Sequence, residues 1–204
     1  WIDAQNTWRR WMVKHNIPLR KGKPLPLPML NACSSHQFAE MTKANEQNQM
    51  EFVDAYLQKG LKLDYWWMDA GWYVGAEEKG WTWTGTWEVD RSPNRFPNGL
   101  RAISDYAHSK DFKTIVWFEP ERVAAGTWLA TNHLEWILGG AGGGLLNLGN
   151  PDAWNWLVNH IDKIITDEGI DLYRQDYNID PLEFWRKNDP ADRQGITENK
   201  YVMG

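Results

Sequence analysis

The sequence predicts an α/β fold built on a parallel sheet. Three observations support this prediction: short apolar runs recur along the 204 residues, segments of helical periodicity separate them, and several runs end in a carboxylate. Strands and helices that alternate at such spacing form βαβ units with right-handed crossovers. Hydrophobic residues make up 42% of the chain, which is enough to bury the core of such a fold.

The N-terminal part is expected to lie outside this sheet. Residues 1–16 predict a helix with Trp8 and Trp11 on one face, and prolines then interrupt any regular period. We therefore interpret residues 1–26 as an approach segment and residues 27–204 as the α/β domain.

Two strands with a helix between them are predicted next. The apolar run at 27–32 is typical of a buried strand that leads into a small polar loop. A helix follows over 42–59, where Gly60 is a C-terminal stop. A second strand is expected over 63–68, and it ends at Asp69.

The second strand leads into a long loop. Residues 73–98 contain three Trp and two turn signals with proline, and structureless loops of this length are uncommon unless they are functional. A helix is expected over 99–110, followed by a third strand over 113–118 that ends in Glu119 and Glu121.

The next segment has a weaker pattern before it becomes regular again. The glycine cluster at 139–144 is expected to be a flexible loop rather than a phosphate cradle, because no strand leads into it and no Lys follows it. Residues 145–148 predict a short strand. A helix is predicted over 151–168, with Asn150 as its N-cap and Gly169 as its stop.

A last strand is predicted over 170–174, and the tail over 181–204 is expected to be charged and irregular.

Two architectures fit this alternation, the doubly wound sheet and the (β/α)8 barrel, and in both the functional residues lie at the carboxyl ends of the strands. No glycine fingerprint for dinucleotides follows the first strand, which favours the (β/α)8 TIM barrel. A complete barrel takes about 250 residues, so four clear strands and one weak strand predict about the first half of a barrel. The predicted strand ends carry the carboxylates of Asp69, Glu119, Glu121 and Asp176.

Composition argues against several classes of protein. The net charge is −5 without long runs of one sign, which argues against a nucleic-acid partner. No apolar run reaches the roughly 18 residues of a membrane span, so no membrane partner is expected. The lone Cys33 excludes an internal disulfide framework, and nothing in the sequence fixes the localisation. The five His have no paired i, i+4 spacing, so no metal and no cofactor are predicted.

The 15 Trp residues allow two interpretations. Either the protein is simply rich in large aromatic side chains, or a site holds the flat apolar face of a ligand such as a sugar ring. Paired carboxylates at strand ends in an aromatic-walled cleft are what glycoside hydrolysis needs. Asp176 is the best candidate, because Arg174 shares its face of the strand and would keep its pKa low. Alternatively, Asp176 only pairs with Arg174 or caps a turn, and Asp69 only accepts hydrogen bonds from loop N–H groups near Gly71.

Four motifs stand in order along residues 27–204. They are DAGW at 69–72, GTWEVD at 85–90 with RFPNGL at 95–100, VWFEPE at 116–121 and YRQDYN at 173–178. Together they resemble glycoside hydrolase family 36, the α-galactosidases or melibiases. The resemblance implies a retaining glycosidase on a (β/α)8 barrel that acts on an oligosaccharide or glycoside. It also implies that Asp176 is the nucleophile, and that Asp69, Trp117, Arg174 and Asn178 bind the substrate.

The sequence departs from the family pattern at several positions. Ala70 stands where the family has a second Asp, Arg174 replaces a Lys and Gln175 replaces a Trp. Nothing after Asp176 fits the family's acid/base carboxylate, so that group is expected beyond this chain. The 204 residues alone are therefore expected to be inactive and to require the remaining half of the barrel. An α-N-acetylgalactosaminidase-type specificity and a non-catalytic carbohydrate-binding barrel stay open as alternatives.

Overall fold

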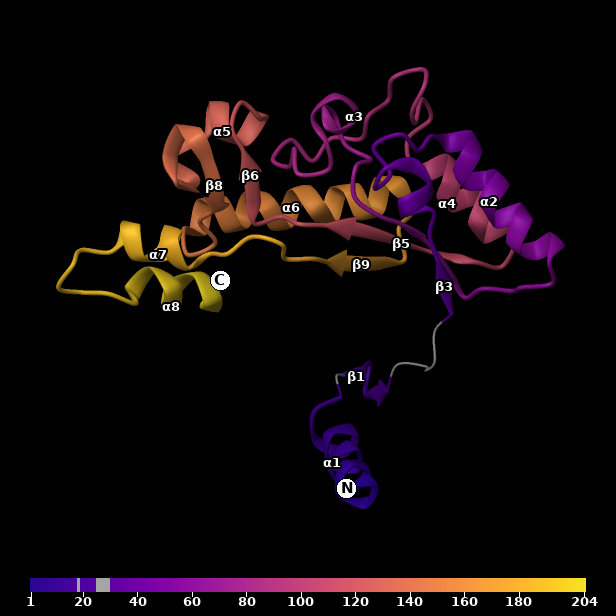
Figure 1. The fold of residues 1–204 in the computed structure, drawn as a ribbon, viewed down its shortest axis with the longest axis horizontal. Coiled ribbons are helices and arrows are strands. Elements are labelled where there is room, and N and C mark those ends of the chain that lie inside the picture. Colours follow the sequence, from indigo (N-terminus) through magenta and orange to yellow (C-terminus); the bar gives the residue numbers. More distant parts are fainter. Residues whose placement is uncertain (18, 25–29) are drawn as a thin grey trace. The chain divides into compact units, whose positions relative to one another are not determined.

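A four-stranded parallel sheet forms the centre of the structure, a computed structural model that describes residues 1–17, 19–24 and 30–204 (Figure 1). The strand order is β3-β4-β5-β9, and every neighbouring pair is parallel. The predicted parallel α/β sheet is therefore confirmed. The strands are β3 (Asn31–Ala32), β4 (Tyr65–Met68), β5 (Lys113–Phe118) and β9 (Leu172–Gln175).

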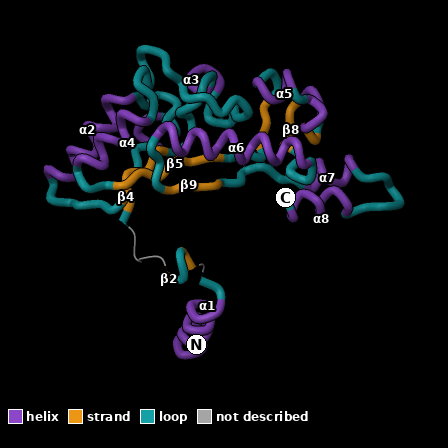
Figure 2. The backbone as a smooth tube through the Cα atoms, turned by 180° about the vertical axis from the view of Figure 1, so that it is seen from behind, coloured by secondary structure: helices purple, strands orange, loops and turns teal. Residues whose placement is uncertain are grey.

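Three long helices follow the first three of these strands. They are α2 (Glu46–Gln58), α4 (Arg101–Ser109) and α6 (Pro151–Glu168). Helix α4 packs against β5 and contacts both α2 and α6, and Figure 2 shows α6 running along β5 and β9. Local capping fixes both ends of α6: Asn150 accepts from the N–H of Asp152 at 2.9 Å, as predicted, and Gly169 ends the helix with φ +65°.

Helix α2 begins later than the sequence pattern indicates. Asn45 and Asn48 form a reciprocal capping box, with N···O distances of 2.8 and 3.1 Å. Before it lie three consecutive non-glycine residues with left-handed backbones, Ala39, Glu40 and Met41. The capping box starts the helix at Glu46, so the first residues of the predicted helix, from residue 42, lie in the turn before it.

Two parts of the chain contradict the sequence prediction. The glycine cluster is not simply a flexible loop, because Gly143 and Gly144 lie buried in strand β8 (Gly143–Leu146). A Cβ on Gly144 would lie 2.0 Å from the carbonyl oxygen of Leu138, so the close approach of these backbones requires glycine. Strand β8 joins β6 (Arg122–Ala124) and β7 (Ile137–Leu138) in a separate antiparallel sheet with the order β6-β8-β7.

The C-terminal tail is helical, which the prediction missed. It forms α7 (Leu182–Asn188) and α8 (Ile196–Met203). The carboxylate of Asp189 accepts hydrogen bonds from the N–H groups of Gly195, Ile196 and Thr197 at 2.7, 2.9 and 3.0 Å. These N–H groups at the start of α8 have no acceptor within the helix, and Asp189 supplies one. This cap comes from well outside the helix in sequence, where a search for local signals does not find it.

The remaining elements are short. Within the long loop lies α3 (Ala76–Lys79), and α5 (Trp128–Asn132) precedes β7. Three 3₁₀ turns span Ser35–Phe38, Leu134–Trp136 and Gly140–Gly142. No helix in the described part of the chain is long and apolar enough to cross a membrane.

The first 30 residues form a compact unit of their own. It contains α1 (Ile2–His15), as predicted, and an antiparallel pair formed by β1 (Leu19–Arg20) and β2 (Lys23–Pro24). Residues 25–29, which include the first half of the predicted first strand, lie outside the described residues. The boundary between the approach segment and the barrel therefore stays a prediction.

Candidate active site

A cavity of about 240 Å³ lies beyond the carboxyl ends of β4, β5 and β9. The structure brings all five predicted site residues together in its lining. Three further residues, which were not among the predicted site residues, complete it. The lining consists of Asp69, Trp117, Arg174, Asp176 and Asn178, with Glu40, Ala70 and Trp81.

Asp176 follows β9 directly and is surrounded by hydrogen-bond donors. The indole Nε1 of Trp117 donates to its Oδ2 at 2.8 Å, and the backbone N–H of Tyr177 donates to its Oδ1 at 3.0 Å. Arg174 places Nη1 3.2 Å from Oδ2. Burial raises the pKa of Asp176, but the hydrogen bonds from Trp117, Asn178, Tyr177 and Arg174 lower it further, to about 2. The carboxylate therefore stays ionised at neutral pH.

The low pKa agrees with the sequence prediction, although its cause is broader than predicted. The sequence pointed to Arg174 as the cation that keeps Asp176 charged, whereas Trp117 and Asn178 have the larger effects. Arg174 also lies over the ring of Trp67, with 4.7 Å between its Cζ and the ring centroid. Its planar group is thus held between an aromatic face and the carboxylate.

Trp117 forms a wall of the cavity that has little freedom to move. Its side chain is 1% exposed, and its ring lies 6.1 Å from that of Trp81 and 6.3 Å from those of Tyr73 and Trp87. Part of the Trp content therefore builds this wall, and the same rings also belong to the core. The packing interpretation of the Trp count therefore holds for these rings, and the interpretation as a sugar-binding wall stays a prediction.

Asp69 and Glu40 supply two more carboxylates to the lining. Asp69 accepts the backbone N–H of Ala70 at 2.8 Å, which is the loop contact considered as its structural role, and it also faces the cavity. Glu40 comes from the loop after β3. A Cβ on Gly71 would lie 2.6 Å from the Glu40 carbonyl oxygen, so glycine at that position lets the two loops approach.

A buried arginine ties these loops together. Arg95 is 1% exposed, and its guanidinium donates to the carbonyl oxygens of Met41 at 3.1 Å, Gly71 at 2.5 Å and Ala44. Its Nε lies 3.4 Å from the carboxylate of Asp90. The motif that contains Arg95 therefore supports the wall of the cavity without lining it.

The family model of the melibiases matches residues 8–204 of this chain. The chain belongs to the melibiase family. α-Galactosidase Mel36A of Lactobacillus acidophilus is 29% identical over 168 residues, which are 78% of this chain and 22% of that protein. α-Xylosidase XylQ of Lactiplantibacillus pentosus is 26% identical over 178 residues, again 78% of this chain and 22% of that protein.

Solved structures show the same fold. The α-galactosidase from Lactobacillus brevis superposes with a TM-score of 0.73 at 20% identity, over 87% of this chain and 24% of that one. A variant of α-galactosidase AgaA from Geobacillus stearothermophilus, in complex with stachyose, gives 0.70 at 18% identity, over 86% and 25%. The parallel sheet of this melibiase chain is therefore part of a (β/α)8 barrel, as predicted. The chain spans about a quarter of the length of these relatives.

The two other strand-end carboxylates do not line the cavity. Glu119 is fully buried and accepts from Arg122 and from the backbone of Asn178. Glu121 points to the opposite side of the sheet, where Gln175 donates to it at 2.5 Å. Burial raises the pKa of Glu121 to about 7. The sequence placed all these acids at one end of the sheet but could not assign them to its faces.

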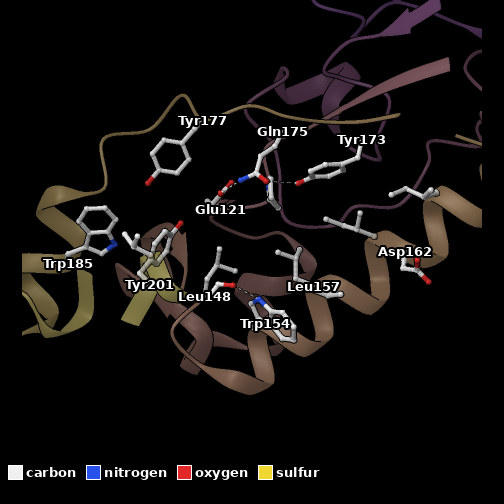
Figure 3. Close-up of a pocket in the computed structure, with 16 residues that line it drawn as sticks. Glu121, Leu148, Trp154, Leu157, Asp162, Tyr173, Gln175, Tyr177, Trp185 and Tyr201 are labelled. Carbon is white, nitrogen blue, oxygen red and sulfur yellow. Dashed lines mark hydrogen bonds between the residues drawn. The ribbon is translucent and has the colours of Figure 1, made fainter. Parts of the chain in front are cut away.

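A larger cavity, of about 750 Å³, lies between β9 and α6 (Figure 3). Tyr173 and Gln175 face it, whereas Arg174 and Asp176 face the smaller cavity, because successive side chains of a strand alternate. Its walls are mostly apolar and include Leu157, Ile161 and Ile165 of α6. Strand β9 therefore separates a polar cavity from an apolar one.

Proposed function

We propose that the protein containing this chain is a retaining glycoside hydrolase that acts on terminal α-galactosides or related α-glycosides. Asp176 would be its nucleophile, and Asp69, Trp117, Arg174 and Asn178 would bind the sugar. The observation that carries the proposal is an ionised carboxylate in an aromatic-walled cavity at the carboxyl ends of barrel strands. A pKa of about 2 suits a nucleophile and is unfavourable for a general acid, which must be protonated.

In this mechanism the Asp176 carboxylate attacks the anomeric carbon and forms a covalent glycosyl-enzyme. A second carboxylic acid protonates the leaving oxygen and afterwards, as a base, activates the water that releases the sugar. In a retaining enzyme the two groups are about 5–5.5 Å apart. We expect the acid/base group to come from the remaining half of the barrel.

The apolar cavity supports this requirement for more of the barrel. Strand β9 has β5 on one side and forms an edge of the described sheet, as β3 does on the other side. Barrels close such edges by pairing them with further strands. We expect the remaining half of the barrel to pair with these edges and to cover the cavity beside α6.

The relatives support the proposed substrate class. Mel36A is an α-galactosidase, XylQ is an α-xylosidase, and AgaA has been solved with stachyose and with raffinose. An oligosaccharide or glycoside is therefore the expected substrate. Ala70 lines the cavity without a polar side chain, which leaves an α-N-acetylgalactosaminide as an alternative. Comparing nitrophenyl α-galactoside, α-xyloside and α-N-acetylgalactosaminide as substrates of the whole protein would separate these specificities.

The decisive experiment replaces the nucleophile. Asp176→Ala in the whole protein should lower kcat by at least about a thousandfold, and azide should restore turnover and yield a product of inverted configuration. Asp180→Ala is the matched control, because Asp180 accepts from the N–H of Leu182 and does not line the cavity. Near-normal hydrolysis by Asp176→Ala would contradict the assignment. Sugar binding without hydrolysis by the unmutated protein would instead favour a non-catalytic carbohydrate-binding barrel.

A further inference from the structure

We propose that the ion pair between Glu119 and Arg122 positions Asn178 for its hydrogen bond to Asp176. This inference rests on the proposed function, because it concerns the same site. Neither Glu119 nor Arg122 lines the cavity, so both would act through another residue.

Glu119 is the first residue after β5 and is fully buried. Its Oε2 accepts from Nε of Arg122 at 2.7 Å, and its Oε1 accepts the backbone N–H of Asn178 at 2.5 Å. Arg122 in turn donates from Nη2 to the carbonyl oxygen of Asn178 at 2.5 Å. One ion pair therefore holds both backbone polar groups of Asn178.

This arrangement fixes the segment that carries the nucleophile. The N–H of Asp176 donates to the carbonyl oxygen of Phe118 at 2.8 Å, so the chain after β9 is attached to the end of β5 at Asp176 and again at Asn178. The Asn178 side chain is the second largest hydrogen-bonding contribution that lowers the pKa of Asp176. Holding its backbone limits the positions from which that side chain can donate.

The burial of the Glu119 carboxylate, beside an Arg122 side chain that is 18% exposed, favours a positioning role over a stabilising one. Replacing a buried ion pair by apolar residues is often neutral for stability, because removing two charges from water offsets most of their attraction. Charge-assisted hydrogen bonds do, however, impose a narrow geometry on their partners. Arg122 also lies over the ring of Trp81, with 5.4 Å between its Cζ and the centroid, and Trp81 lines the cavity.

The test measures the pH dependence of kcat/KM in the whole protein. Glu119→Gln loosens Asn178 and weakens its hydrogen bond to Asp176, so the pKa of Asp176 should rise even though the removed negative charge by itself would lower it. The acid limb of kcat/KM should then move upward by about one pH unit. We expect kcat to fall about 10- to 100-fold with little change in KM. Asn178→Ala should move the limb in the same direction, and combining it with Glu119→Gln should add less than the sum of the two shifts.

Glu168→Gln is the matched control. Glu168 is also buried and accepts from one arginine, Arg91 at 2.6 Å, and from one backbone N–H, that of Arg101 at 2.8 Å. It ends α6 and does not line the cavity. Its loss should lower stability in the same way but leave the acid limb in place.

The outcomes separate this proposal from the proposed function. If the acid limb of kcat/KM lies at the same pH in Glu119→Gln as in Glu168→Gln, the positioning role is overturned, even if Asp176→Ala is inactive. Near-normal turnover by Asp176→Ala would overturn the proposed function itself. Should Glu119→Gln fail to fold, Arg122→Lys decides the question. Lysine keeps the charge but cannot contact Glu119 and the Asn178 carbonyl with a planar fork, so the limb should still move upward.

Discussion

At the residue scale, the chemistry of the cavity depends on which donors reach Asp176. Its carboxylate is only partly removed from water, with 31% of the side chain exposed, yet its pKa falls to about 2. Burial alone would raise the pKa, so the donors outweigh it. Trp117 makes the largest contribution among them and is held by aromatic neighbours. The indole N–H of Trp117 therefore does more than any other donor to keep Asp176 ionised.

Trp117→Phe tests this contribution. Phenylalanine keeps an aromatic wall but removes the N–H donor, so the pKa of Asp176 should rise. A carboxylate with a depressed pKa is active above that pKa and loses activity as the pH falls through it. The acid limb of kcat/KM should therefore move to higher pH in the variant. Trp66→Phe is the control, because Trp66 is equally buried but donates to Gln49 at 3.2 Å. If the acid limb of kcat/KM lies at the same pH in both variants, the Trp117 N–H does not lower the pKa of Asp176.

At the element scale, α6 and β5 follow the sequence closely. Helix α6 spans the predicted residues, because Asn150, Pro151 and Gly169 act within one turn of its ends. Strand β5 also matches its predicted bounds. The pairing partners of β8 and the cap of α8 come from outside these elements, so the sequence predicted only part of β8 and missed α8. Local signals thus set the ends of elements, whereas pairing requires the folded chain.

Asn150→Ala tests the cap of α6. Losing the side-chain acceptor leaves the N–H of Asp152 without its partner, and this should lower the free energy of unfolding by about 1 kcal/mol. Asn155→Ala, an exposed site within the same helix, should be neutral or slightly stabilising, because alanine has the higher helix propensity. Urea-induced unfolding followed by Trp fluorescence would measure both. A cap variant as stable as the Asn155 variant would contradict the role of Asn150.

At the scale of the whole molecule, Arg95 links segments that are far apart in sequence. It joins the loop after β3, the end of β4 and the long loop in which it lies. Three of its contacts are to backbone carbonyls, which would lose a charged hydrogen-bond donor if the guanidinium were removed. The shape of the Glu40 and Asp69 side of the cavity therefore depends on a residue outside it.

Arg95→Ala should lower the free energy of unfolding by about 3–5 kcal/mol, because it removes the cation beside Asp90 and the donor shared by three backbone carbonyls. Arg101→Ala is the control: Arg101 pairs with Asp105 on the surface at 2.9 Å, and its loss should cost less than about 1 kcal/mol. Thermal or urea-induced unfolding of the whole protein would compare them. Similar losses of stability in the two variants would show that Arg95 is not the link proposed here.

The sequence by itself determined the parallel α/β architecture and the strand ends that carry Asp69, Trp117 and Asp176. It could do so because hydrophobic periodicity and caps act over a few residues, and because parallel strands end on the same side of a sheet. Only the tertiary structure decided that Glu119 and Glu121 lie outside the cavity, whereas Glu40 lines it. It also decided that Arg95 holds the loops that form the cavity wall. These outcomes depend on which loops touch, and on hydrogen bonds between residues that are distant in sequence.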